Sequence, residues 1–268
     1  MLLVKVPLIN GLKRTEGCEN AGNFIINSLR DIFSNEEDKK IDVKSLDLEE
    51  IHIDKNNLEE ANKLIYKNSF KIFETKERTI FLGGDHSISF SICKAFLDYC
   101  KEKNKEPCLI IFDAHADCMY PIDKKIPTHE EWVYSLISFG FPKENILIVG
   151  VRNIEESEKE FIKENKIKLI KMSNILEDLE NICDTIMEFT NKKETYISID
   201  IDVIDPAFAP GTAFKEVGGF SSREFIYLIQ RLKKIKTLRG VDIVEVNPSK
   251  DKEELTIKLG AKIVSELI

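Results

Sequence analysis

The sequence predicts an α/β protein whose mostly parallel sheet of about eight strands is covered by helices on both faces. Three observations support this prediction. Short, almost wholly apolar runs, typical of buried parallel strands, recur along the chain. They alternate with longer segments of helical periodicity. No Ser/Gly-rich linker and no internal repeat interrupts the alternation, so residues 1–268 are expected to form a single domain.

Each strand is expected where an apolar run is bounded by turn residues. The first run is followed by Pro7, the third stops at Gly83 and Gly84, and the fourth follows Pro107. The second run alternates apolar and polar residues, which predicts a more exposed strand. The expected strands are residues 2–9, 41–48, 79–82, 109–112, 146–151, 168–172, 195–201 and 238–246.

The segments between the strands show helical spacing or N-cap signals. The segment after the second strand places its apolar side chains on one face. Ser87 and Thr128 are good N-caps, Glu131 completes a capping-box pattern after Thr128, and Ser221 or Ser222 caps a later helix. The expected helices are residues 21–33, 58–74, 87–99, a short segment after Thr128, 154–164, 176–189, a segment from 221 or 222 to 235, and 251–267.

Composition limits the class of function. The 268 residues are 43% apolar and 32% charged, typical of a globular protein that can bury a sizeable core. The net charge of −8 argues against a nucleic-acid partner, because no basic surplus neutralises phosphates, and it suits a cationic substrate. No apolar run approaches the roughly 18 residues that span a membrane, and the N-terminus lacks a signal-peptide pattern. The six scattered cysteines are therefore expected to be reduced thiols of a cytoplasmic protein.

The stretch 109–117, Leu-Ile-Ile-Phe-Asp-Ala-His-Ala-Asp, gives the strongest functional signal. It begins as a buried strand and then places Asp113, His115 and Asp117 at alternate positions. If the extended backbone continues past Phe112, these side chains point to one side, at the strand end where open α/β sheets bind ligands. Two carboxylates and an imidazole that face each other require a compensating cation. The stretch therefore predicts half of a metal site.

Three further strand ends repeat this arrangement. His86 follows a buried strand in Gly-Gly-Asp-His-Ser, Asp200 and Asp202 close another in Ile-Ser-Ile-Asp-Ile-Asp, and Glu245 ends the last strand. Taken alone, each is more often a turn or cap feature. Their conjunction favours a two-metal site in which carboxylates bridge the ions. The oxygen-rich ligands favour Mn²⁺ over structural zinc, and a water held between two such ions would lose its proton near neutral pH.

The blocks at residues 83–87, 113–117, 198–206 and 245–248 resemble the signature blocks of the ureohydrolases, a family that includes arginase, agmatinase, guanidinobutyrase and formimidoylglutamase. They occur in the family's order and with its spacing over nearly the whole chain. The resemblance implies a three-layer α/β/α fold of the arginase/deacetylase type, two Mn²⁺ ions, and hydrolysis of a guanidino or related amidine C–N bond. It also implies a homo-oligomer, either a trimer or a hexamer.

The same resemblance gives each candidate residue a role. The first ion would be held by His86, Asp113, Asp117 and Asp200. The second would be held by Asp113, His115, Asp200 and Asp202. Asp113 and Asp200 would bridge the ions, Asp117 would also orient the attacking hydroxide, and Glu245 would pair with the substrate guanidinium. His129 would be the proton-shuttling histidine that assists departure of the amine, although its position also suits a residue at the start of a helix.

The chain departs from the family pattern beside the site. Glu130 stands where a small residue commonly follows the shuttle histidine, and Phe214 replaces a threonine of the Gly-Thr-Gly-Thr-Pro loop. Segment 119–128 lacks the Asn and Ser residues with which arginases hold the α-amino acid end. Agmatine, which yields putrescine and urea in polyamine biosynthesis, is therefore the first choice of substrate. Arginine, guanidinobutyrate and formiminoglutamate are alternatives.

Two other classes of protein stay open at this point. DxH strands also occur in binuclear phosphoesterases, although the Gly-Asn-His block of those enzymes is missing here. A relative that keeps its metals with little catalysis is suggested by Glu130 and Phe214. Release of urea, or of phosphate from an aryl phosphate, would distinguish these hypotheses.

Overall fold

The computed structural model describes residues 1–123, 125–175 and 178–268. Within them, eight strands form one sheet in the order β2-β1-β3-β8-β7-β4-β5-β6, and every neighbouring pair is parallel. The strands are β1 (Leu2–Val6), β2 (Asp47–Glu50), β3 (Thr79–Gly83), β4 (Pro107–Phe112), β5 (Ile146–Val151), β6 (Lys168–Lys171), β7 (Glu194–Asp200) and β8 (Leu238–Val244). The predicted α/β class with a parallel sheet is confirmed.

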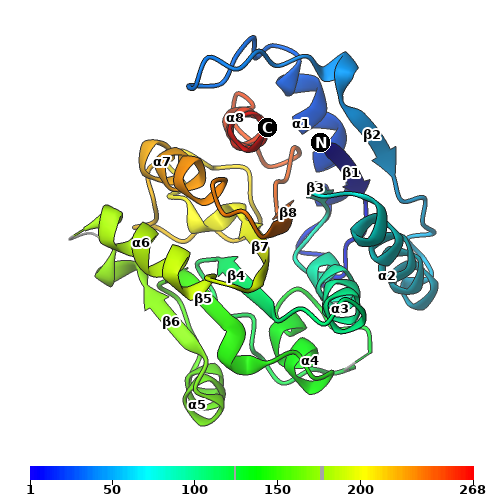
Figure 1. Cartoon of the computed structure of the whole chain (residues 1–268), viewed down its shortest axis with the longest axis vertical. Helices are drawn as coiled ribbons and strands as arrows, with labels where there is room; N and C mark the ends of the chain where they lie inside the picture. Colours follow the sequence, from blue (N-terminus) through cyan, green and yellow to red (C-terminus); the bar gives the residue numbers. More distant parts are fainter. Residues whose placement is uncertain (124, 176–177) are drawn as a thin grey trace.

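Helices cover both faces of this sheet, which makes three layers (Figure 1). One face is covered by α1 (Ala21–Leu29), α6 (Leu179–Phe189), α7 (Ser222–Leu232) and α8 (Leu255–Leu267). The other is covered by α2 (Leu58–Thr75), α3 (Ser87–Glu102), α4 (Trp132–Ser138) and α5 (Glu156–Asn165). Short 3₁₀ helices are η1 (Cys18–Asn20), η2 (Val43–Ser45), η3 (Lys143–Asn145), η4 (Met172–Asn174) and η5 (Ile201–Val203). No helix in the described part of the chain is both long and apolar enough to cross a bilayer.

Two apolar clusters form the core, one on each face of the sheet. Ile80 and Leu82 of β3 belong to the cluster beneath α1, α7 and α8, whereas Phe81 between them belongs to the cluster beneath α2 and α3. This division follows from the two-residue period of a strand. Burial on both faces is why the central strands appear in sequence as continuous apolar runs.

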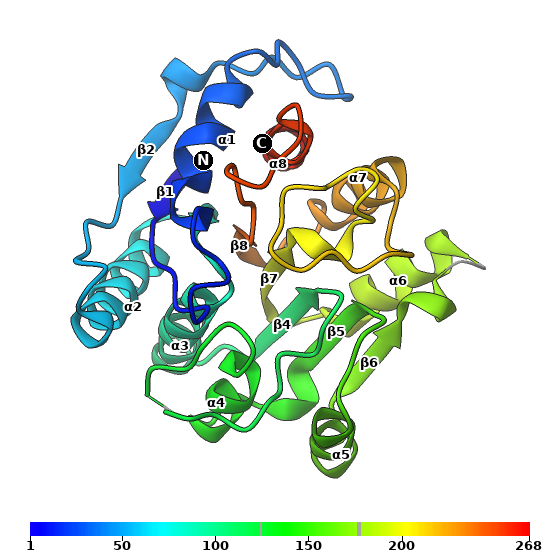
Figure 2. The ribbon, with the colours of Figure 1, turned by 180° about the vertical axis from the view of Figure 1, so that it is seen from behind.

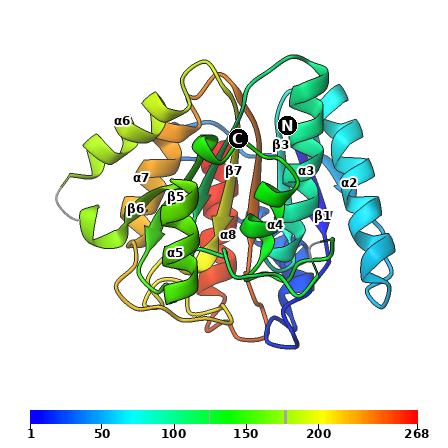
Figure 3. The same ribbon diagram turned by 90° about the horizontal axis from the view of Figure 1, so that it is seen from below.

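The loops that follow the strands gather at one edge of the sheet. All strands run in the same direction, so their carboxyl ends meet there, and the N-terminal, β4 and β7 loops lie in front of the sheet in Figure 2. From below, these loops lie together at one end of the molecule (Figure 3). Four adjacent central strands, β3, β8, β7 and β4, deliver the candidate site residues to this edge.

The strand predicted over 41–48 is mostly wrong. Val43–Ser45 form a 3₁₀ turn, because the side chain of Asp42 accepts a hydrogen bond of 3.1 Å from the Lys44 backbone N–H. Strand β2 begins only at Asp47, where it pairs with β1 as an exposed edge strand. A short polar side chain that bonds to nearby backbone competes with extended structure, and apolar alternation does not reveal this competition.

Helix starts were predicted with mixed success. Ser221 caps α7, and Glu224 completes the capping box. The Glu131 side chain accepts the Thr128 N–H at 3.0 Å, but α4 begins only at Trp132. The predicted start of the sixth helix at residues 176 and 177 lies outside the described residues.

Candidate metal centre

The sequence-predicted residues meet at the carboxyl ends of the four central strands. His86 follows β3, Asp113 follows β4, Asp200 is the last residue of β7, and Glu245 follows β8. These strands are neighbours in the sheet, so residues that lie up to 159 positions apart in sequence become adjacent. The arrangement is that of a ligand site at the strand ends of an open α/β sheet.

Two groups of side chains have the spacing of metal ligands. His86 Nδ1 lies 3.1, 3.0 and 3.3 Å from carboxylate oxygens of Asp113, Asp117 and Asp200. His115 Nδ1 lies 3.0 Å from Asp202 Oδ2 and 3.4 Å from Asp113 Oδ1. Within each of two triplets, the potential ligand atoms lie within 4.8 Å of one another; the triplets are His86 with Asp113 and Asp200, and Asp113 with His115 and Asp202. Asp113 belongs to both.

The buried acids of this centre fit divalent cations. Burial and repulsion by Asp113 raise the pKa of Asp117 to about 7, and burial together with Asp202 raises the pKa of Asp200 well above its usual range. His86 Nδ1 and Asp113 Oδ2 are buried without a hydrogen-bond partner. Carboxylates and imidazoles whose free lone pairs converge are suited to ions that prefer oxygen and nitrogen, such as Mn²⁺.

The backbone brings these ligands together by turning, not by strand alternation. Strand β4 ends at Phe112, and Asp117 has a left-handed φ of 52°. Asp202 lies in η5, where its N–H bonds to Asp200 Oδ1 at 2.8 Å, and its Oδ1 accepts the Ala114 N–H at 3.1 Å. The expectation that extended backbone continues past Phe112 is therefore wrong, although Asp113, His115 and Asp117 all reach the centre.

His86 is held from behind by a buried polar network that the sequence did not reveal. Its Nε2 lies 2.9 Å from Ser198 Oγ, which donates to Asp242 Oδ1 at 2.7 Å. Asp242 is fully buried and also accepts hydrogen bonds of 2.9 Å from Ser89 and Tyr196. Since the Ser198 hydroxyl proton goes to Asp242, Ser198 must accept from His86 Nε2–H, which leaves the Nδ1 lone pair free to face the carboxylates.

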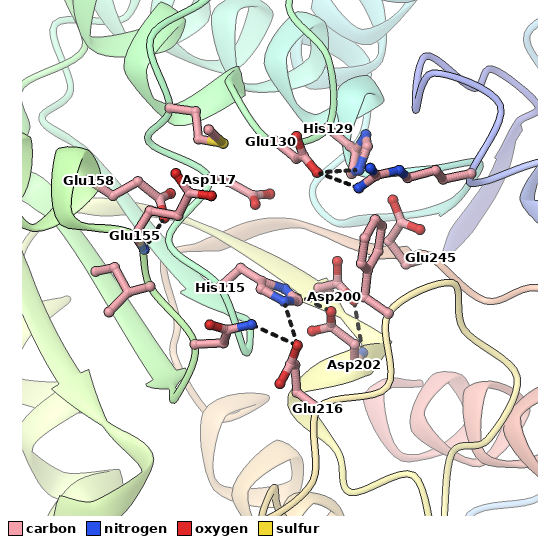
Figure 4. A pocket seen from close by; sticks show the side chains of 15 residues that line it. His115, Asp117, His129, Glu130, Glu155, Glu158, Asp200, Asp202, Glu216 and Glu245 are labelled. Atoms are coloured by element: carbon pink, nitrogen blue, oxygen red, sulfur yellow. Dashed lines mark hydrogen bonds and ion pairs between the residues drawn. The ribbon is translucent and has the colours of Figure 1, made fainter.

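A cavity of about 240 Å³ opens above the two groups and is strongly acidic (Figure 4). Arg14 is the one Lys or Arg among the described residues that line it. Eight carboxylates line the cavity: Asp117, Glu130, Glu155, Glu158, Asp200, Asp202, Glu216 and Glu245. Such a lining attracts a cation and repels an anion.

Glu245 and His129 both line this cavity. Glu245 is 2% exposed; its Oε1 accepts the His86 N–H at 2.9 Å, and Cys18 Sγ lies 3.8 Å from its Oε2. Burial and the nearby Asp85 raise the pKa of Glu245 well above its usual range. His129 is buried with neither ring nitrogen hydrogen-bonded, and its ring lies 5.5 Å from that of Phe214.

Several residues that line the cavity were not identified from the sequence. Asn153 and Glu155 follow β5 directly, so an inspection of every predicted strand end would have found them. Glu158 also lines the cavity, but its carboxylate is held by the N–H groups of Cys118 and Glu155 at 2.9 and 3.0 Å. Arg14 comes from an N-terminal loop that carries no recognisable signal.

The fold and the site together define a class of protein: a parallel α/β protein with a candidate two-metal centre of His and carboxylate side chains at its strand ends. Comparison with known proteins narrows this class. The family model for the Arginase family matches residues 1–268. The chain is 26% identical over 246 residues to an arginase of Staphylococcus aureus (strain MRSA252), covering 84% of this chain and 80% of that protein. It is 28% identical over 228 residues to an agmatinase of Bacillus subtilis (strain 168), covering 85% and 75%.

The structure also resembles that of formimidoylglutamase from Bacillus subtilis. The TM-score is 0.87 at 24% identity, over 99% of this chain and 85% of that one. The chain thus belongs to the arginase family and is a ureohydrolase of that family. These relatives are named for three different activities, so family membership alone does not identify the substrate.

Proposed function

We propose that the protein is a Mn²⁺-dependent hydrolase that releases urea and an amine from a guanidino substrate, with agmatine preferred. The acidic cavity is the observation on which this proposal rests. Agmatine carries a guanidinium at one end, an ammonium at the other, and no carboxylate. A wall of carboxylates favours both ends of such a molecule.

We assign one ion to each of the two groups of side chains and add Asp117 and Asp200 as the family resemblance implies. His86, Asp113, Asp117 and Asp200 would hold one ion, and the second would be held by Asp113, His115, Asp200 and Asp202. When bound, two Mn²⁺ ions would activate water at neutral pH and stabilise negative charge that develops on the reacting group.

Glu245 would bind the guanidinium that is cleaved. Its carboxylate is buried and has one oxygen fixed by the His86 N–H, so its position is set before substrate arrives. Burial and the neighbouring Asp85 raise the pKa of this carboxyl, so its ionised form needs more positive charge than the protein supplies. A substrate guanidinium would supply that charge through charge-assisted hydrogen bonds.

His129 would donate a proton to the departing amine. Both of its ring nitrogens are buried and unpaired, and the residue lines the cavity. Glu130 Oε1 lies 3.5 Å from Nε2. The cationic imidazole would be a suitable acid because an amine leaving group needs a proton as the C–N bond breaks.

The charged groups of the cavity favour an amine over an α-amino acid as the substrate. Arg14 would have to bind a substrate carboxylate, but its guanidinium already lies 3.7 Å from Glu130 Oε1 and over the Phe214 ring at 5.8 Å. Elsewhere on the cavity wall, Glu155 and Glu216 would repel an anion.

The presence of Arg14 favours one second candidate. Formiminoglutamate carries two carboxylates, and Arg14 could pair with one of them if it released Glu130. That substrate would yield formamide in place of urea.

A substrate panel tests the proposal. Purified protein loaded with Mn²⁺ is assayed for urea with agmatine, arginine, guanidinobutyrate and guanidinoacetate, and for formamide with formiminoglutamate. Agmatine should give the highest kcat/KM, and His129→Ala should abolish most turnover without loss of metal. A protein that keeps its metals but turns over no member of the panel would refute the proposed activity and favour a metal-binding relative with little catalysis.

A further inference from the structure

We propose that Glu216 is a positioning residue that fixes His115 for the second metal ion. This inference rests on the proposed metal centre but not on the identity of the substrate. Glu216 lies in the loop after β7, close to His115 (Figure 4), and its carboxylate is bonded to Asn153.

The two nitrogens of His115 face different partners. Nδ1 points to Asp113 and Asp202, at 3.4 and 3.0 Å, and Nε2 lies 3.5 Å from Glu216 Oε1. A neutral imidazole carries one proton. If Nδ1 binds an ion, that proton must be on Nε2, where the Glu216 carboxylate is the facing acceptor.

Glu216 is itself held in place. Asn153 Nδ2 donates to the same Oε1 at 2.8 Å. Arg152 Nη2 donates at 2.7 Å both to the Glu216 carbonyl and to the Asp202 carbonyl. This arginine therefore ties the loop of Glu216 to the turn that carries Asp202.

Two glycines let the loop of Glu216 pass close to the turn after β7. A Cβ at Gly219 would lie 2.5 Å from the Val203 carbonyl oxygen and 2.7 Å from Arg152 Nη2. Gly218 has a left-handed φ of 83°, and its N–H bonds to Asp205 Oδ2 at 2.6 Å. On its other side, His115 packs edge-on against Phe214 at 5.9 Å.

The two histidines of the centre are thus supported in different ways. His86 is backed by the neutral Ser198 hydroxyl, with Asp242 one step behind. His115 faces a carboxylate directly. A carboxylate partner orients a ligand histidine and raises its basicity, and the loss of such a partner typically weakens metal affinity by about 10- to 100-fold. Removing Glu216 should therefore affect one ion and spare the other.

Glu216 also lines the substrate cavity, which suggests a competing role. A carboxylate at that wall could bind the cationic end of the substrate without any effect on the metal. The two roles differ in what is measured: the first changes Mn²⁺ affinity in the absence of substrate, and the second changes only KM.

The test is calorimetric titration of metal-free protein with Mn²⁺, together with EPR spectroscopy to distinguish one ion from a coupled pair. The variants are Glu216→Gln and Asn153→Ala. Asn153 is exposed and holds the Glu216 carboxylate, so its loss should leave the fold intact. Glu155→Gln is the matched control for metal affinity, since Glu155 lines the same cavity without contacting a ligand histidine.

Glu216→Gln should bind the first ion as wild type does and the second about 10- to 100-fold more weakly. Asn153→Ala should show a smaller loss in the same direction, and Glu155→Gln none. Wild-type affinity for both ions in Glu216→Gln, with only KM altered, would overturn the positioning role. Wild-type protein that binds no Mn²⁺ would overturn it together with the proposed centre. Failure of the substrate panel alone would leave the metal result intact.

Discussion

Replacing Ser198 by alanine should lower both the stability of the protein and its affinity for the first metal ion. The Ser198 hydroxyl connects His86 Nε2 to Asp242 inside a fully buried network. Its loss removes a bond to a neutral ring, about 1 kcal/mol, and one to a carboxylate, about 2 kcal/mol. The total of about 3 kcal/mol corresponds to a Tm lower by roughly 9 °C for a chain of this size.

Ser89→Ala is the matched control for this substitution. The Ser89 hydroxyl donates to the other oxygen of Asp242 at 2.9 Å and lies 3.4 Å from Ser198 Oγ. Its only bond to His86 is from the Ser89 backbone N–H to the His86 carbonyl, at 3.2 Å, which an alanine would keep. Ser89→Ala should lower the free energy of unfolding by about 2 kcal/mol, the contribution of a single hydrogen bond to a carboxylate. It should leave the His86 tautomer unchanged.

The assay compares thermal unfolding of metal-free protein with Mn²⁺ titrations of the same samples. Ser198→Ala should lower the affinity for the first Mn²⁺ ion by about tenfold or more, because His86 can then rotate or carry its proton on Nδ1. Ser89→Ala should bind metal as wild type does. Equal metal affinities in the two variants would refute the reasoning that Ser198 sets the His86 tautomer.

Three further predictions concern the substrate pocket and a surface ion pair. Glu245→Ala should lower kcat/KM by about 10²- to 10³-fold, because a desolvated guanidinium loses its counter-charge; urea kinetics at matched Mn²⁺ content would measure this loss, and a change below threefold would contradict the assigned role. Phe214→Thr removes the ring that packs on His129 and should shift the arginine-to-agmatine ratio of kcat/KM upward by about tenfold; an unchanged ratio would show that this ring does not select the substrate. Hydrogen bonds from Arg223 at 2.7 and 2.9 Å lower the pKa of Glu36 to about 2. Because the folded pKa lies below the unfolded one, this pair should contribute about 1 kcal/mol above pH 4.5 and lose that contribution as the pH falls toward 2; urea unfolding of Glu36→Gln and wild type at pH 7 and pH 3 should show the difference shrinking, and a constant difference would exclude the ion pair as its source.

The sequence was sufficient to place the fold and to bring the candidate ligands to one edge of the sheet. Buried parallel strands are distinctive because both faces are apolar, so the polar residues that follow them stand out. His86, Asp113 and Asp200 were found in this way. The same logic places Glu245 without any knowledge of its contacts.

The remaining features depend on packing between segments far apart in the chain. Asp242 lies within a buried strand, where only the positions of Ser89, Ser198 and Tyr196 show that its charge is satisfied. Glu216 faces His115 because Arg152 holds its loop. Such contacts have no local sequence pattern.

The turns at the centre were also beyond prediction. Asp117 and Glu245 have left-handed φ values of 52° and 62°. Residues other than glycine rarely adopt this conformation, and they keep it only where the surrounding structure enforces it. Strand alternation therefore pointed to residues that do converge at the strand ends, although turns and not an extended backbone bring them there.

Asp113 is shared by the two groups of candidate ligands, and this sharing has a consequence for metal loading. An ion bound in one group would partly neutralise a carboxylate that the other group also offers. The two binding equilibria are then linked, and whatever the first ion does to the affinity of the second, the second does equally to the first. At limiting Mn²⁺, the activity plotted against metal concentration should therefore not fit a single dissociation constant.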